Sequence, residues 1–81
     1  MKLEYTRRAL DSLEEAPVTV RKAFFKQARL LTQNLRHPSP RAKKYEEAGD
    51  IWQARVSRGW RFYFTIEGDT YTIMRLAEHP K

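Results

Sequence analysis

The chain has 81 residues, which allows one domain with a small core, because a domain of this size buries only about 60% of its unfolded surface. Hydrophobic residues make up 41% of the sequence, enough for one layer of helices on one sheet and too many for a disordered chain, while the absence of cysteine excludes disulfides and thiolate zinc sites. With two histidines we expect neither a metal site nor another cofactor, and the net charge of +6 indicates a polyanionic partner.

The first half of the chain predicts a short strand followed by two helices. Residues 2–5 are expected to form the strand, and Thr6 is a suitable N-cap for the first helix. Pro17 suits the first position of the second helix, where its missing N–H would have no partner, and the helical pattern continues to about Leu35. Its apolar stripe, spaced by four, four, three and four residues, comprises Val20, Phe24, Ala28, Leu31 and Leu35.

The second half predicts strands. The segment His37–Pro40 ends the helix, and a basic loop containing Arg41, Lys43 and Lys44 follows. Three strands over 51–57, 60–66 and 71–77 are separated by glycine-containing turns and should form an antiparallel meander. We therefore predict a single α+β domain over 1–81, with two N-terminal helices packed on a twisted antiparallel sheet in the order β-α-α-β-β-β and the first strand joining the meander at an edge. No apolar run has the length of a signal segment or membrane span, so we expect a cytoplasmic protein that does not bind membranes.

Alternation along these strands separates a core face from an open face. In the middle strand the apolar set is Trp60, Phe62, Phe64 and Ile66. The last strand is ambiguous because both of its faces carry apolar residues, and Arg75 is the residue that decides which face points outward. The side chains expected on the open face are Gln53, Arg55, Arg61, Tyr63, Arg75 and, beyond the last strand, His79.

This composition favours a phosphate-binding surface. Arginine binds phosphate oxygens bidentately, the segment with Lys43 and Lys44 could fold over the sheet edge, and an exposed Tyr63 could stack on an unpaired base. Between Arg36 and Arg61 there are seven basic residues and three acidic ones. The alternative is that open antiparallel faces are ordinarily polar and that these arginines only keep the protein soluble.

The same face holds candidates for RNA cleavage, which requires deprotonation of a 2′-hydroxyl, stabilisation of the phosphorane charge and protonation of the 5′-oxygen. Arginines can supply the second requirement. His79 is the candidate general acid because histidine is the side chain that changes charge near neutral pH, although a residue so near the chain end could simply be exposed and frayed. The base stays open: Lys43 or Lys44 would have to lose its proton, and Glu46 is a further option. His37 is more simply a helix-end residue.

Four segments resemble the RelE/ParE superfamily, the toxins of bacterial type II toxin–antitoxin systems: Arg41–Lys44, Asp50–Val56, Gly59–Phe64 and Leu76–His79. The resemblance implies an endoribonuclease that cleaves messenger RNA in the ribosomal A site without a metal, leaving a 2′,3′-cyclic phosphate, and that a cognate antitoxin neutralises. It also implies the roles of individual residues. In ribosome-dependent members an arginine at the place of Arg61 stabilises the scissile phosphate, and a terminal His or Arg belongs to the active site, which corresponds to His79. Basic residues of the preceding strand correspond to Arg55, Gln53 stands where some members have lysine, and Lys43 with Lys44 resembles the RNA-contacting segment.

Two departures leave alternatives open. The chain ends at Lys81 without the extension that carries a catalytic tyrosine in some members, and Tyr63 is not an obvious replacement. The superfamily also includes inhibitors of DNA gyrase that share the fold and cleave no RNA. The chain could therefore be a gyrase inhibitor, or a catalytically degenerate member that binds RNA through Arg41, Lys43 and Lys44. The His79 ending favours the nuclease branch.

Overall fold

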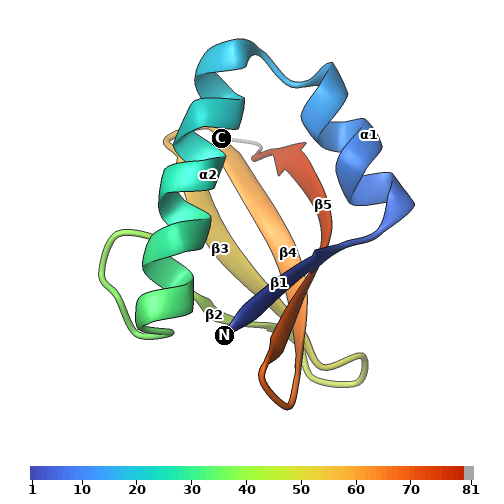
Figure 1. Cartoon of the computed structure of the whole chain (residues 1–81), viewed down its shortest axis with the longest axis vertical. Coiled ribbons are helices and arrows are strands. Elements are labelled where there is room, and N and C mark those ends of the chain that lie inside the picture. Colours follow the sequence, from blue (N-terminus) through green and yellow to red (C-terminus); the bar gives the residue numbers. More distant parts are fainter. Residues whose placement is uncertain (80–81) are drawn as a thin grey trace.

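A computed structural model describes residues 1–79, and Pro80 and Lys81 lie outside the described residues. Two helices pack on one face of a five-stranded sheet, as Figure 1 shows. Within residues 1–79 no helix is both long and apolar enough to cross a membrane. The elements in chain order are β1 Lys2–Tyr5, α1 Arg7–Glu15, α2 Val18–Gln33, β2 Lys43–Glu46, β3 Ile51–Ser57, β4 Trp60–Glu67 and β5 Thr70–Glu78.

The sheet has the strand order β1-β5-β4-β3-β2, in which only β1 and β5 run parallel. This confirms the predicted α+β class and the place of the first strand at an edge. The prediction of a loop at Lys43 and Lys44 is wrong, because this segment forms the other edge strand, β2, with Lys43 opposite Gln53 on β3. Its four charged and aromatic residues show no apolar alternation, because neither face of this short edge strand is buried in the core.

Both helices begin close to the predicted positions. The backbone N–H of Ala9 donates to Thr6 Oγ1 at 3.0 Å, so Thr6 caps α1 as predicted. The helix α2 begins at Val18, which places Pro17 one residue before the helix and not at its first position. The helix also ends at Gln33, before the predicted Leu35, although the Leu35 side chain still packs partly buried against the core.

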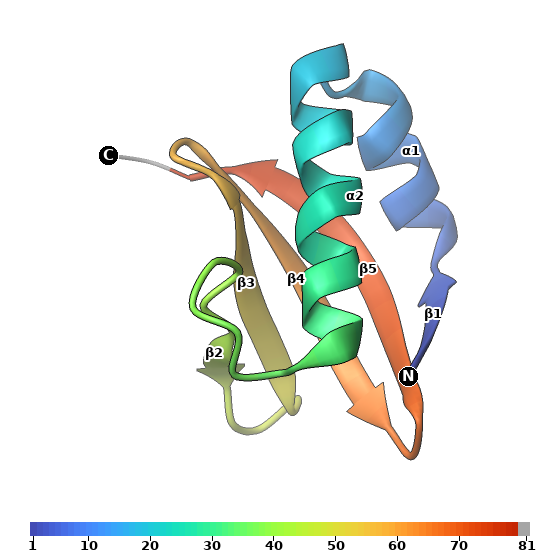
Figure 2. The ribbon, with the colours of Figure 1, turned by 60° about the vertical axis from the view of Figure 1, so that its left-hand side comes forward.

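The core lies between the helices and the sheet, and Figure 2 shows that no helix covers the opposite face of the sheet. The predicted stripe of α2 supplies Phe24, whose ring meets the ring of Phe62 edge-on at 5.1 Å between centroids. Phe62 and Phe64 are fully buried, which confirms the predicted core face of β4. The open face is therefore the surface on which a site can lie.

A bulge in β5 explains the ambiguous pattern of the last strand. Tyr63 on β4 pairs with Arg75, whereas Phe64 pairs with Ile73, so Met74 is an extra residue. Ile73 and Leu76 consequently both reach the core although they are three positions apart. The Thr6 hydroxyl donates to the Met74 carbonyl oxygen at 2.9 Å and holds the bulge to the start of α1. The bulge is thus the reason why Arg75 points to the open face, as predicted.

Candidate functional site

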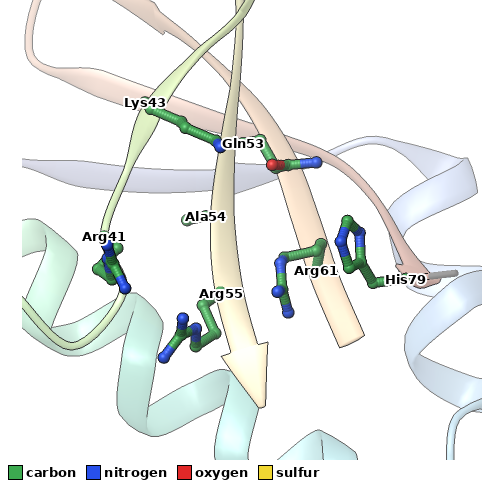
Figure 3. A pocket seen from close by; sticks show the side chains of 7 residues that line it. All are labelled: Arg41, Lys43, Gln53, Ala54, Arg55, Arg61 and His79. Carbon is green, nitrogen blue, oxygen red and sulfur yellow. The ribbon is translucent and has the colours of Figure 1, made fainter. Parts of the chain in front are cut away.

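A basic cavity of about 230 Å³ opens beside β3 and β4, on the side of the sheet away from the helices (Figure 3). Six of the nine side chains that the sequence nominated line it, together with Ala54. The six are Arg41, Lys43, Gln53, Arg55, Arg61 and His79. They come from the segment before β2, from β2, β3 and β4, and from the residue after β5, so the sheet brings together residues from distant parts of the sequence.

Two arginines of the cavity lie side by side on neighbouring strands. Arg55 on β3 pairs directly with Arg61 on β4, an arrangement of like charges that by itself disfavours the sheet. The backbone N–H of Arg55 donates to the Pro40 carbonyl oxygen at 2.6 Å, which fixes the preceding loop against β3. Arg41 follows in the left-handed backbone region with a φ of 49°, and its side chain reaches the same cavity. The backbone thus holds three guanidinium groups close together.

The Arg61 side chain is held by the turn between β3 and β4. Its Nη1 donates to the carbonyl oxygens of Ser57 at 2.8 Å and Trp60 at 2.9 Å. Burial lowers the pKa of Arg61 from its usual value, and the positive charge of Arg55 lowers it further. Within residues 1–79 Nε and Nη2 have no hydrogen-bond partner, so an anion in the cavity could accept from them.

His79 is fixed to the site through its backbone. Its N–H donates to the Gly59 carbonyl oxygen at 2.8 Å, which continues the pairing of β5 beyond Glu78. The imidazole is exposed to solvent and lies beside Arg61 in Figure 3. The backbone of His79 is therefore paired in the structure and is not a frayed chain end.

The cavity carries uncompensated positive charge. Among the described residues that line it, none has a carboxylate. Within residues 1–79 the ion pairs involve Lys2, Arg7 and Lys44. The four cationic side chains of the cavity, Arg41, Lys43, Arg55 and Arg61, therefore have no acidic partner within 4.0 Å. Across residues 1–79 no group of three or more His, Asp or Glu side chains could hold a metal ion. An anion is the ligand that such a cavity favours.

The structure does not bring Lys44 to this site. Because β2 is a strand, adjacent side chains point to opposite faces, and Lys44 lies 5.0 Å from the ring centroid of Trp52, on the side away from Lys43. Its ammonium group forms an ion pair with Asp50, and this hydrogen bond raises the pKa of Lys44. A raised pKa opposes the loss of a proton that a general base requires. Glu46, the other candidate base, does not line the basic cavity.

The prediction that Tyr63 is an exposed aromatic residue is wrong. Its side chain is only 8% exposed, because Arg75 covers one part of the ring at 4.2 Å and Tyr45 contacts it edge-on at 4.9 Å. Gln53 Nε2 donates to Tyr63 Oη at 3.1 Å, and Gln53 is buried as well. Tyr63 and Arg75 line a neighbouring groove and not the basic cavity.

The exposed aromatic side chain of this region is Tyr45, which the sequence analysis missed. It is 54% exposed and lies on β2, the strand that was expected to be a loop. Had Lys43–Glu46 been taken as a strand, alternation would have placed Tyr45 on the same face as Lys43. A third hollow shares Arg41 and Lys43 with the basic cavity and adds Arg36 and His37, so the basic surface continues past the sheet edge.

Solved structures of toxins share this architecture over nearly the whole chain. A YoeB/ParE toxin from Agrobacterium tumefaciens superposes with a TM-score of 0.82 at 15% identity, covering 99% of this chain and 100% of the other. This chain has the RelE/ParE toxin fold. RelE in the archaeal RelE–RelB complex from Pyrococcus horikoshii gives a TM-score of 0.80 at 15% identity, covering 99% and 96% of the two chains. The isolated RelE toxin of E. coli gives 0.77 at 17% identity, covering 99% and 85%.

The likeness to the RelE/ParE toxin fold is one of structure. No family model matches the sequence, and no curated protein matches it. The identities of 10–17% among these structures are compatible with one fold and different sites, so the activity has to be argued from the residues of this chain.

Proposed function

We propose that this chain is the toxin of a type II toxin–antitoxin system and that it cleaves messenger RNA in the ribosomal A site. The observation that carries the proposal is the basic cavity, which four cations without acidic partners line together with His79 on the open face of a RelE/ParE toxin fold. The resemblance of the sequence segments around Arg55, Arg61 and His79 to ribosome-dependent members supports the same activity. The enzyme is proposed to need no metal.

In the proposed reaction the 2′-oxygen of a nucleotide attacks the adjacent phosphorus and the bond from phosphorus to the 5′-oxygen breaks. The products are a 2′,3′-cyclic phosphate and a 5′-hydroxyl. Arg55 and Arg61 would stabilise the charge that builds on the phosphorane, and the His79 imidazolium would donate its proton to the departing 5′-oxygen. No carboxylate lines the cavity among residues 1–79, so the proton of the 2′-hydroxyl would pass to a water molecule or to Lys43 in its neutral form, the one candidate base that lines the cavity.

Arg41 and Lys43 are proposed to bind the phosphates that flank the scissile one. Both line the basic cavity and also the neighbouring hollow beyond the sheet edge, so they lie where an RNA strand would pass from one to the other. Backbone phosphates are the part of RNA that cationic side chains bind without regard to sequence. These two residues should therefore affect affinity more than the cleavage step.

A cognate antitoxin is the proposed protein partner. The structures with this fold include RelE bound to RelB from E. coli and the heterotetrameric complex of YoeB and YefM from Staphylococcus aureus. In this chain the outer surface of the helices exposes Leu10, Val18 and Phe25, which suits the apolar side of an added helical segment. The antitoxin could cover this surface, the basic cavity, or both.

Primer extension on messenger RNA during in vitro translation tests the proposal. Wild-type protein should produce cuts only in ribosome-bound message. Arg61→Ala should reduce the cleavage rate about 10²- to 10³-fold through loss of charge stabilisation, and His79→Ala about 10²-fold or more through loss of the general acid. Lys22→Ala is the matched control, since it removes an exposed positive charge from α2 and should cleave like the wild type.

The other outcomes are informative. Message that stays intact with wild-type protein would contradict the nuclease assignment, and a DNA supercoiling assay would then test the gyrase inhibitor. Binding to message without cleavage would instead indicate a degenerate RNA-binding member. Cuts that persist in both Arg61→Ala and His79→Ala would place the active site elsewhere.

A further inference from the structure

A second hollow lies beside the basic cavity on the open face of the sheet, and we call it the Tyr45 groove. Its volume is about 430 Å³, which falls in the range of small-ligand sites. Tyr45 and Ile51 bound it at the β2 edge, Arg8 and Met74 bound it at the opposite side, and Tyr63 and Arg75 lie between them. Nothing in the proposed cleavage reaction uses this groove.

The groove adjoins the basic cavity, and one hydrogen bond joins the walls of the two hollows. Gln53 lines the cavity and Tyr63 lines the groove, and the bond from Gln53 Nε2 to Tyr63 Oη joins the two walls. In the sheet Lys43, Gln53, Tyr63 and Arg75 form one cross-strand row that separates the hollows. A polymer whose phosphate lies in the cavity would therefore have its neighbouring residue close to the groove.

Tyr45 gives the groove an aromatic surface. Its side chain is 54% exposed, and its ring contacts Tyr63 edge-on, with 64° between the ring planes. The other large apolar side chains with comparable exposure in residues 1–79 do not line the groove. An exposed aromatic ring on a cationic face is the arrangement with which proteins stack unpaired bases, because every base has a π-face.

The bulge in β5 gives the groove its polar groups. The extra residue Met74, held by the Thr6 hydroxyl, places Arg75 over the Tyr63 ring at 4.2 Å. Stacking on the ring fixes the plane of the guanidinium, and its N–H groups can donate to the ring nitrogens and carbonyl oxygens at the edge of a base. Among residues 1–79 neither Arg8 nor Arg75 has an acidic partner within 4.0 Å, and Glu46 is the carboxylate in the lining.

We propose that the Tyr45 groove binds an unpaired nucleobase of the RNA strand whose phosphate occupies the basic cavity. The proposal rests on the proposed function, because that function supplies the RNA strand. Tyr45 stacks on the base, and Arg75 binds its edge. The groove therefore contributes to the choice of the sequence that is cut, which the cationic side chains of the cavity do not read.

Fluorescence anisotropy with short 2′-O-methyl RNA tests this site, because such RNA lacks the hydroxyl that attacks the phosphate and stays intact. A series of oligonucleotides, each with one abasic position, is titrated with wild-type protein, Tyr45→Ala, Tyr45→Phe and Arg55→Ala. One abasic position should weaken wild-type binding roughly 10-fold. Tyr45→Ala should bind intact RNA with the same roughly 10-fold loss of affinity. Its affinity should not fall further for the oligonucleotide that lacks the base at that position. Tyr45→Phe should behave like the wild type.

Arg55→Ala separates the groove from the cavity. It should weaken binding of every oligonucleotide by a similar factor and leave the effect of the abasic position unchanged. Wild-type affinity in Tyr45→Ala together with weakened binding in Arg55→Ala would overturn the base site while the basic cavity stands. Failure of wild-type protein to bind any oligonucleotide would overturn the base site, and the primer extension assay on ribosome-bound message would then decide the role of the basic cavity separately. Loss in Tyr45→Ala with no loss in Arg55→Ala would support the base site and contradict the cavity assignment.

Discussion

The two faces of β4 contrast most clearly in how they bury their side chains. On the helix side Phe62 and Phe64 are fully buried among other apolar groups, including Phe24. On the open side Tyr63 is nearly as buried, yet its cover is a guanidinium and a second tyrosine, and its hydroxyl is hydrogen-bonded to Gln53. The helix side stabilises the fold. The open side lowers the stability, because it holds like-charged side chains close together. Substitutions should therefore separate stability from ligand binding.

The largest expected effect is on the helix side. Phe62→Ala should lower the free energy of unfolding by about 3–5 kcal/mol, because it leaves a cavity in a small core. Phe25→Ala is the matched control, since Phe25 is 54% exposed and should lose less than about 1 kcal/mol. Urea unfolding monitored by circular dichroism measures both. Equal losses in the two variants would mean that this face is not the core.

The next effect concerns the polar burial of the open side. Tyr63→Phe removes the oxygen that accepts from Gln53 and leaves a buried amide without its partner, which should cost about 1–3 kcal/mol of unfolding free energy. The double variant Gln53→Met and Tyr63→Phe should recover most of this loss, because both polar partners are then replaced. Thermal and urea unfolding of the wild type, Tyr63→Phe, Gln53→Met and the double variant form a double-mutant cycle. A double variant that is only as stable as the sum of two losses would contradict the buried hydrogen bond.

Lys43 and Lys44 sharpen the comparison because they are neighbours on opposite faces of β2. Lys43→Ala should reduce the slope of log affinity against log salt for single-stranded RNA by about 0.7, the effect of one phosphate contact. Lys44→Ala changes the net charge equally but removes a lysine paired with Asp50, so its slope should stay that of the wild type. Anisotropy over a salt series measures both slopes. Equal slopes in the two variants would show that overall charge, and not the basic cavity, binds the RNA.

The smallest effect has the opposite sign. Arg55→Thr removes one of two like charges that pair directly across β3 and β4, and should raise the free energy of unfolding by about 0.2–1 kcal/mol. The same substitution should weaken RNA binding. Thr65→Ser, on β4 opposite Thr72 of β5 and outside both hollows, is a control for changes of strand propensity. A loss of stability in Arg55→Thr would mean that the guanidinium stabilises the sheet.

The features that the sequence predicts well are those that depend on local periodicity. The α2 stripe with Phe24 and the alternation around Phe62 and Phe64 each repeat along one element, and the Thr6 cap requires only its own turn. The ends of α2 were predicted less accurately, because Pro17 and the segment His37–Pro40 mark where a helix can begin and must have stopped, and not its first and last residues.

The remaining features depend on pairing between strands. β2 carries no periodic apolar signal, and it is a strand because β3 offers it hydrogen bonds. For the same reason the predicted placement at the open face agrees with the structure for Arg55 and Arg61 and not for Lys44, whose side-chain direction follows from the pairing of β2 with β3. The bulge at Met74 depends on how β5 pairs with β4. Its sign in the sequence is that Ile73 and Leu76 are both apolar although they are three positions apart, which a regular strand would place on opposite faces.

The strand order has a consequence for the synthesis of the protein. Among the described strands β5 is made after the other four, yet it lies between β1 and β4 in the sheet. It also carries the Met74 carbonyl that anchors Thr6, and His79 follows directly after it. A nascent chain that still holds β5 in the exit tunnel can complete neither the sheet nor the basic cavity. We therefore expect the sheet to close, and the anion-binding surface to form, only once β5 has emerged from the ribosome.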